Sequence, residues 1–182
     1  MSKTILLDGS SLTRAQLVAV ARQGASVALD QAQLARVQRA ADFLAEKVSC
    51  GEPTYGVTTG FGSNADKLLG AHRVRDELPA SHAGAPEGTL MEELQHNLII
   101  THAVCVGKPF GEDVVRAMLL IRINTLMRGH SGIRVSTLEA LTAMLNAGVV
   151  PVVPEKGSVG ASGDLAPLSH LAIVLLGGGE AF

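Results

Sequence analysis

Aromatic residues are scarce in this sequence: they make up 3% of the 182 residues, and tryptophan is absent. Apolar residues nevertheless account for 47% of the chain, carried mainly by alanine, leucine and valine. With so few of the aromatic side chains that strands favour, this composition points to packed helices. We therefore expect a mainly α-helical protein with short strands and a sizeable buried core.

The chain also has no large excess of charge of either sign. The 15 Lys and Arg residues nearly balance the 17 Asp and Glu residues, for a net charge of −2. No basic run is interleaved with aromatics, and the longest late apolar run, residues 171–176, is too short to span a bilayer. With no signal peptide visible, we expect a cytoplasmic protein with no nucleic-acid or membrane partner.

Cysteine is almost absent too. Cys50 and Cys105 are the only two, and they form neither a CxxC pair nor a metal-ligand spacing. This excludes a thiolate metal centre, and we expect two reduced thiols and no metal.

Helix-start signals recur along the chain. Thr13 with Gln16, and Asp30 with Gln33, have the spacing of capping boxes. Apolar periodicity and Gly or Pro stops extend the pattern. The predicted elements are a strand at 4–7 and helices at 13–24, 30–48, 89–106, 112–128, 134–146 and from about 166. The 112–128 segment is apolar nearly all round, which predicts a buried helix.

A Gly-rich loop at residues 157–168 contains the tripeptide Ala161-Ser162-Gly163. Because Gly163 has no side chain, its amide nitrogen can approach the Ala161 carbonyl carbon and close a five-membered ring. Loss of two waters, one carrying the Ser162 hydroxyl, would leave a methylidene electrophile. Ordinary side chains supply no comparable carbon electrophile.

The same tripeptide also fits a plain Gly-rich turn before a helix. A serine hydrolase is the other alternative, but its nucleophile elbow needs Gly-x-Ser-x-Gly. The segments 160–164 and 129–133 end in Asp164 and Ile133 instead. The motif therefore excludes the hydrolase and leaves the turn open.

A second Gly-rich segment, residues 55–62, reads Tyr-Gly-Val-Thr-Thr-Gly-Phe-Gly and holds the only tyrosine. On composition alone, Tyr55 could be a surface residue with its hydroxyl in water. His102 continues a stripe with Leu94 and Leu98 at every fourth position, which is typical of a structural histidine in a helix.

Together, the 157–168 loop, the 55–62 loop and the helix around His102 resemble the aromatic amino acid ammonia-lyases and aminomutases. The resemblance runs from about Leu6 to Gly179, and is greatest to histidine ammonia-lyases. It implies the N-terminal part of the helical fumarase/aspartase-like fold, with a Gly-rich lid loop. It also implies that Ala161, Ser162 and Gly163 mature without any metal to methylidene-imidazolone (MIO), with Asp164 in support.

The resemblance further assigns residues to the substrate. Tyr55 matches the catalytic base, His102 and Gly62 match substrate-binding positions, and Gly56 and Gly60 shape the lid. His102 is followed by a small residue, as in histidine-specific members, so the implied reaction converts L-histidine to urocanate in a homotetramer. A phenylalanine or tyrosine ammonia-lyase and a 2,3-aminomutase stay open.

The sequence also departs from the family. Residues 70–89 read as an exposed insertion near the lid, and the family's central helices and further site residues have no counterpart here. We expect residues 1–182 to be one N-terminal domain, a fragment inactive by itself. A non-catalytic, self-associating domain with an uncyclised loop is the alternative from a different class.

Overall fold

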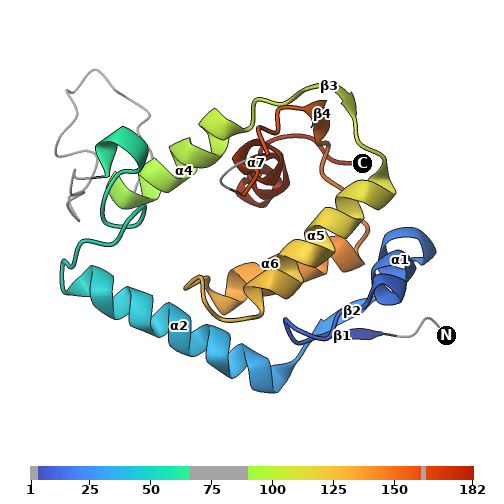
Figure 1. The fold of residues 1–182 in the computed structure, drawn as a ribbon, viewed down its shortest axis with the longest axis horizontal. Helices are drawn as coiled ribbons and strands as arrows, with labels where there is room; N and C mark the ends of the chain where they lie inside the picture. Colours follow the sequence, from blue (N-terminus) through green and yellow to red (C-terminus); the bar gives the residue numbers. More distant parts are fainter. Residues whose placement is uncertain (1–3, 66–89, 161–162) are drawn as a thin grey trace. The chain divides into compact units, whose positions relative to one another are not determined.

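The computed structural model describes residues 4–65, 90–160 and 163–182 (Figure 1). The chain divides into two compact units, residues 1–43 with 102–182 and residues 44–101. The predicted insertion at 70–89 and the pair Ala161 and Ser162 lie outside the described residues.

Helices dominate the described residues, which confirms the predicted mainly α-helical class. The α-helices are α1 (Arg14–Gln23), α2 (Gln31–Ser49), α4 (Leu90–His102), α5 (Glu112–Leu126), α6 (Val135–Asn146) and α7 (Leu165–Ile173). The 3-10 helices are η1 (Gly62–Asn64) and η2 (Val174–Leu176). The strands are β1 (Ile5–Leu7), β2 (Val27–Leu29), β3 (Val106–Pro109) and β4 (Pro154–Lys156).

The first two helices begin where the capping patterns predict. The Thr13 side chain accepts a hydrogen bond from the Gln16 N–H, and the Gln16 side chain accepts one from the Thr13 N–H. At the start of α2, the Asp30 carboxylate accepts from the Gln33 N–H at 2.8 Å. The Gln33 side chain donates to the Met127 carbonyl instead of completing the predicted box, and the Asp30 N–H donates to the Leu7 carbonyl. Both caps satisfy N–H groups that have no partner within the helix.

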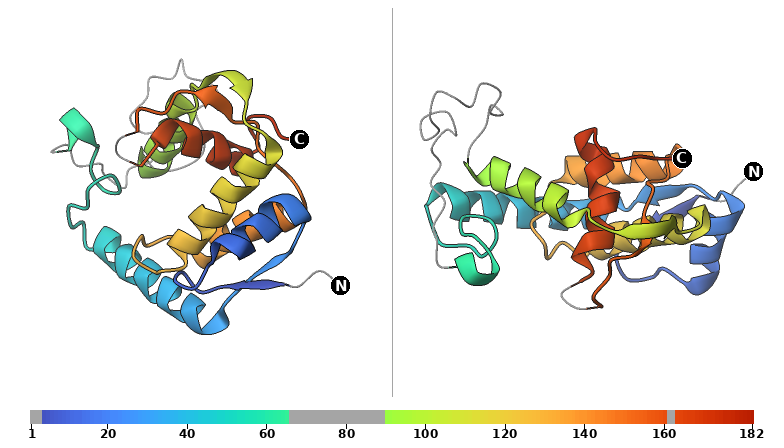
Figure 2. Two further views of the ribbon diagram at one scale, coloured as in Figure 1. Left: turned by 45° about the vertical axis from the view of Figure 1, so that its right-hand side comes forward. Right: turned by 90° about the horizontal axis from the view of Figure 1, so that it is seen from above.

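The core of the larger unit lies around α5, which packs against α1 and α6 (Figure 2). Its buried side chains lie on one face of the helix: Val115, Leu119, Leu120, Ile123 and Leu126. The predicted buried helix is buried on part of its surface only. Ile121 is 50% exposed, because α1 and α6 cover only part of its circumference and Ile121 lines a cavity.

The two small sheets connect segments far apart in the sequence, and only β1 was predicted. β1 pairs in parallel with β2, and β3 pairs antiparallel with β4. Asn146 at the end of α6 holds β2 in place, since its side chain accepts from the Val27 N–H and donates to the Val27 carbonyl, both at 2.9 Å. None of the helices in the described ranges combines the length and apolarity that crossing a bilayer requires.

Candidate functional site

The loop that leads into α7 carries Gly163 and Asp164. Gly163 has φ +81°, and Asp164 has φ +56°. Two consecutive left-handed residues turn the backbone immediately before α7, which begins at Leu165. The predicted cofactor precursors Ala161 and Ser162 lie outside the described residues, so their roles remain predictions.

A hydrogen-bond chain connects the two ends of this loop. The Ser158 hydroxyl donates to the Asp164 carboxylate and accepts from the Gly160 N–H at 3.1 Å. Sequence reasoning missed Ser158. The only available signal was a hydroxyl six residues before an acidic residue, which is too common to single out.

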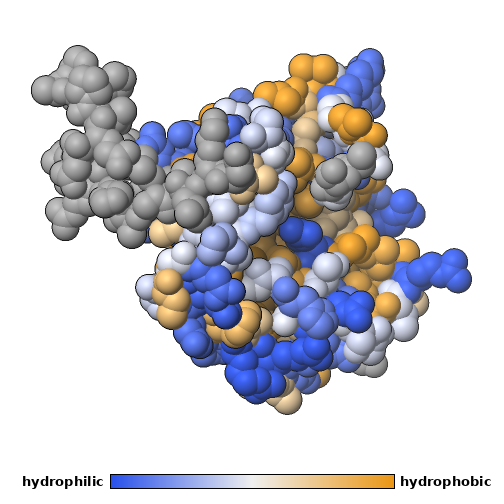
Figure 3. Space-filling view, turned by 60° about the vertical axis from the view of Figure 1, so that its left-hand side comes forward, coloured by the Kyte–Doolittle hydropathy of each residue, from blue (hydrophilic) through white to orange (hydrophobic). Residues whose placement is uncertain are grey.

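A cavity of about 470 Å³ opens beside this loop, between α5 and α7. Its lining is largely apolar, with a few polar groups: Phe110, Met118, Ile121, Arg122, Thr125, Ser158, Gly163, Asp164, Pro167 and Leu168. Apolar side chains also gather on the surface at the right of Figure 3. A concave, mostly apolar pocket with convergent polar groups is the usual form of a small-molecule or partner site.

Arg122 projects from α5 at this cavity and is exposed. Polar side chains on a largely apolar helix, such as those of Arg122 and Asn124, are stabilised by hydrogen-bond partners. Asn124 has one, because its side-chain oxygen accepts from the Gly9 N–H at 3.1 Å. Arg122 forms no hydrogen bond or ion pair among the described residues.

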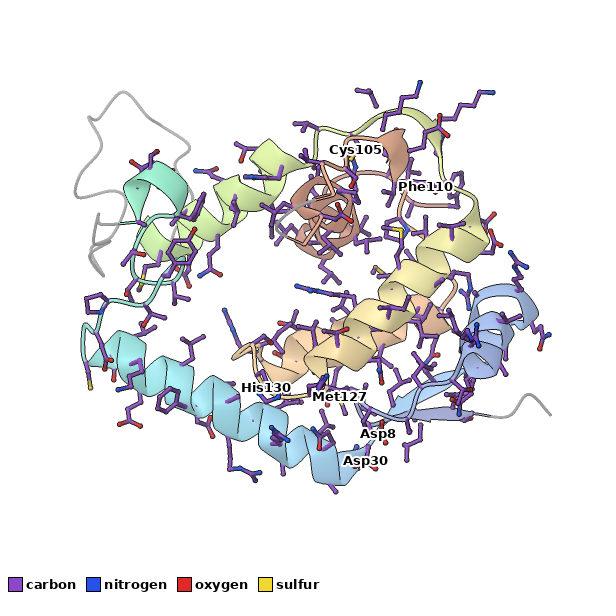
Figure 4. All side chains as sticks on the ribbon, in the orientation of Figure 1. Asp8, Asp30, Cys105, Phe110, Met127 and His130 are labelled. Atoms are coloured by element: carbon purple, nitrogen blue, oxygen red, sulfur yellow. The ribbon has the colours of Figure 1, made fainter. Side chains whose placement is uncertain are left out.

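Cys105 lies beside α7 (Figure 4) and connects this helix to the start of the loop. Its backbone N–H donates to His170 Nε2 at 3.1 Å, which requires that nitrogen to be unprotonated. Burial lowers the pKa of His170 and raises the pKa of the Cys105 thiol. Both shifts favour the neutral forms, His170 as a hydrogen-bond acceptor and Cys105 as a thiol.

Tyr55 and Gly62 lie together in the smaller unit. The Gly62 N–H donates to the Tyr55 hydroxyl oxygen at 3.1 Å. The Tyr55 side chain is 67% exposed, so its hydroxyl is accessible as well as oriented. The 55–62 loop therefore leaves the phenol exposed, and the catalytic role of Tyr55 stays a prediction.

Two buried threonines hold the same loop together from inside. Thr58 donates to the Glu52 carbonyl at 2.9 Å, and Thr59 donates to the Gly60 carbonyl at 2.8 Å. Thr59 also accepts from the Gly56 N–H at 3.2 Å. A Cβ at Gly60 would lie 2.5 Å from the Asn64 carbonyl oxygen, so this position requires glycine.

His102 is the last residue of α4 and is half-buried, as are Leu94 and Leu98 on the predicted stripe. Tyr55, Gly56, Gly60 and Gly62 belong to one unit. His102, Gly163 and Asp164 belong to the other unit. Within the described ranges, no three His, Cys, Asp or Glu side chains gather as metal ligands do.

Known proteins match this chain over nearly its whole length. The profile of the aromatic amino acid lyase family matches residues 12–182. A histidine ammonia-lyase from Gloeobacter violaceus is 50% identical over 177 residues, 97% of this chain and 31% of that protein. The structure of histidine ammonia-lyase from Trypanosoma cruzi superposes with a TM-score of 0.81 and 38% identity, over 98% of this chain and 31% of that one. Tyrosine aminomutase from Streptomyces globisporus gives a TM-score of 0.84 and 35% identity, over 99% of this chain and 30% of that one.

The fold and the loop define a mainly helical domain in which a Gly-rich segment with a cyclisable tripeptide precedes a helix. The chain belongs to the aromatic amino acid lyase family, which confirms the resemblance found in the sequence. It spans about a third of the length of the curated relatives it matches.

Proposed function

We propose that the complete protein containing these residues is an ammonia-lyase that eliminates ammonia from L-histidine to give urocanate. The observation that carries the proposal is the 50% identity to a histidine ammonia-lyase over 97% of this chain. A second histidine ammonia-lyase, from Symbiobacterium thermophilum, is 48% identical over 95%. His102 followed by a small residue also favours histidine as the substrate.

The proposed cofactor is MIO formed from Ala161, Ser162 and Gly163. The described part of the loop fits this group. The Gly163 backbone is in the left-handed region, and apart from its chain neighbours no atom lies within 4 Å of the place that a Cβ on Gly163 would take. The group supplies a carbon electrophile that makes the substrate amine a better leaving group. No metal is part of the proposal.

Tyr55 is proposed to remove the proton from the substrate carbon. The Gly62 N–H, 3.1 Å from the phenolic oxygen, orients the ring and stabilises negative charge on that oxygen. Gly62 is also a proposed substrate contact, while Gly56 and Gly60 let the loop fold as it does. His102 is the proposed contact for the substrate ring.

Assembly and location complete the proposal. We expect a cytoplasmic homotetramer, because the family builds its active sites from several subunits. The apolar cavity beside Asp164 favours the packing of another protein segment against it in the complete, assembled protein. The chain alone, about a third of its relatives' length, is proposed to be inactive.

The test is turnover of the complete protein with histidine, phenylalanine and tyrosine, compared with its Ser162→Ala variant. Urocanate from the wild type and none from the variant supports the proposal. Full turnover by Ser162→Ala contradicts it.

A second candidate, a 2,3-aminomutase, is favoured by the TM-score of 0.84 to tyrosine aminomutase. The products separate the two activities, since a lyase releases an acrylate and an aminomutase releases a β-amino acid. A non-catalytic, self-associating domain predicts neither product and no covalent change in the loop.

A further inference from the structure

A second cavity, of about 190 Å³, lies entirely within the larger unit and shares no lining residue with the cavity between α5 and α7. Three segments line it: residues 8–10 after β1, Gln33 and Arg36 of α2, and Arg128 and His130 after α5. Figure 4 shows His130 beside α2. Pockets for drug-sized ligands begin at about 300 Å³, so this cavity suits a smaller molecule or an ion.

Two guanidinium groups line this cavity without an ion-pair partner. Arg36 and Arg128 are both exposed, and neither takes part in a salt bridge within the described ranges. Arg36 donates to His130 Nε2 at 3.3 Å, since a guanidinium group has donors only. The cavity therefore combines positive charge with several hydrogen-bond donors.

The acidic side chain in the lining, Asp8, is bound to backbone and not to the arginines. Its carboxylate accepts from the N–H groups of Ser10 and Ser11, both at 2.8 Å. These hydrogen bonds lower the pKa of Asp8, and its carboxylate forms no salt bridge with Arg36 or Arg128. Two guanidinium charges against one carboxylate leave an excess of positive charge, which favours an anion over a cation.

Close backbone packing fixes the stems of both arginines. A Cβ on Gly9 would lie 2.9 Å from Arg128 Cγ, and a Cβ on Gly129 would lie 2.9 Å from Arg36 Cγ. The turn that contains Gly9 is itself tied to α5, because its N–H donates to the Asn124 side chain at 3.1 Å. Side chains that are already held in place lose less conformational entropy when they bind a ligand.

We propose that this cavity binds a small oxyanion of the phosphate or carboxylate type, held by Arg36 and Arg128. The fork of a guanidinium group matches the paired oxygens of such anions, and a charged acceptor strengthens each hydrogen bond. The bound anion would connect the end of β1, the first turns of α2 and the end of α5. None of these residues belongs to the proposed catalytic set, so the site is independent of the proposed reaction.

The test is calorimetric titration of the complete protein with inorganic phosphate and, separately, with acetate, at constant ionic strength with chloride as the balancing anion. The wild type should bind one of these anions saturably, at one site per chain. Arg128→Gln and Arg36→Gln each remove one charged donor and should weaken binding by about tenfold or more. Arg14→Gln removes the same charge from an exposed position of α1 outside the cavity, and this matched control should bind like the wild type.

Thermal unfolding with increasing concentrations of the preferred anion gives a second measurement. An anion that binds only the folded protein raises the thermal midpoint, and phosphate also stabilises proteins generally because it is excluded from their surfaces. The rise in the wild type and in Arg14→Gln should therefore exceed the rise in Arg128→Gln. Circular dichroism shows whether each variant keeps the fold, and Arg36→Gln keeps the test decisive if Arg128→Gln does not fold.

Each outcome decides for or against the site. Saturable binding that both cavity variants weaken supports it, and the anion that binds more tightly identifies the type of oxyanion. A wild type that binds neither phosphate nor acetate overturns the proposal. Binding that Arg128→Gln and Arg36→Gln leave unchanged also overturns it, because the anion then lies elsewhere. Equal weakening by Arg14→Gln overturns it as well, since the effect is then one of net charge.

Discussion

Gly157→Ala is the most specific perturbation of the loop, because the structure shows what the added methyl group would meet. The new Cβ would lie 2.4 Å from Cys105 Sγ, 2.9 Å from its Cα and 3.0 Å from its Cβ. Comfortable contacts between such atoms are about 3.5–4.0 Å. Cys105 cannot easily retreat, since it is buried and its N–H is bound to His170.

The expected cost is that of overpacking a well-packed site, about 1–3 kcal/mol in the free energy of unfolding. Each kcal/mol lowers the thermal midpoint by about 2–4 °C in a protein of this size. Cys105→Ala removes the sulfur atom, so Gly157→Ala should cost at least about 1 kcal/mol less in that background. The difference separates the collision from any cost of the backbone conformation.

The assay is urea denaturation of the wild type, both single variants and the double variant, followed by circular dichroism. Gly178→Ala is the control, because the nearest atom to its added Cβ is a side-chain carbon of Ile173 at 3.2 Å, which can move. A Gly157→Ala variant as stable as the wild type would show that the added methyl group meets no collision. An equal cost with and without the Cys105 sulfur would show that the sulfur is not what the methyl group meets.

Further predictions concern the core, the strands and the titratable groups. Leu119→Ala, at a fully buried site, should lower the free energy of unfolding by about 2–5 kcal/mol in urea titrations. Asn146→Leu leaves two backbone groups of β2 unpaired and should cost about 1–3 kcal/mol by the same measurement. A maleimide should label exposed Cys50 well before buried Cys105, as peptide mapping would show. Burial lowers the pKa of His170 from 6.5, so its neutral form stabilises the fold fully above pH 6.5. That contribution is lost as pH falls through the lowered pKa, and the thermal midpoint of His170→Gln should vary less across this window.

Local signals predicted the helices well. The capping patterns at Thr13 and Asp30 depend on residues three positions apart, so the sequence alone reveals them. The predicted helix at 134–146 is also confirmed, as α6. Such features need no knowledge of distant contacts.

The strands depend on distant partners and were mostly missed. β2 has three residues, and its Val27 is bound by Asn146, 119 positions later. The exposure of Ile121 is equally non-local, because it depends on which faces of α5 the neighbouring helices cover. No periodicity within the segment could show either one.

In the candidate site, too, the sequence indicated residue types but not the contacts between them. Motifs alone pointed to Tyr55 and Gly163 as candidates, because the proposed chemistry depends on residue type and order. The sequence could not predict two contacts near them: the hydrogen bond from the Gly62 N–H to the Tyr55 hydroxyl, and the one from Ser158 to Asp164. Those contacts require the backbone path of each loop.

The most direct test of the account is the mass of the loop peptide that spans Ala161 to Leu165 in the complete protein. We expect a deficit of two waters relative to the sequence, and no deficit in Ser162→Ala. An unmodified wild-type peptide from active protein would contradict the proposed cofactor.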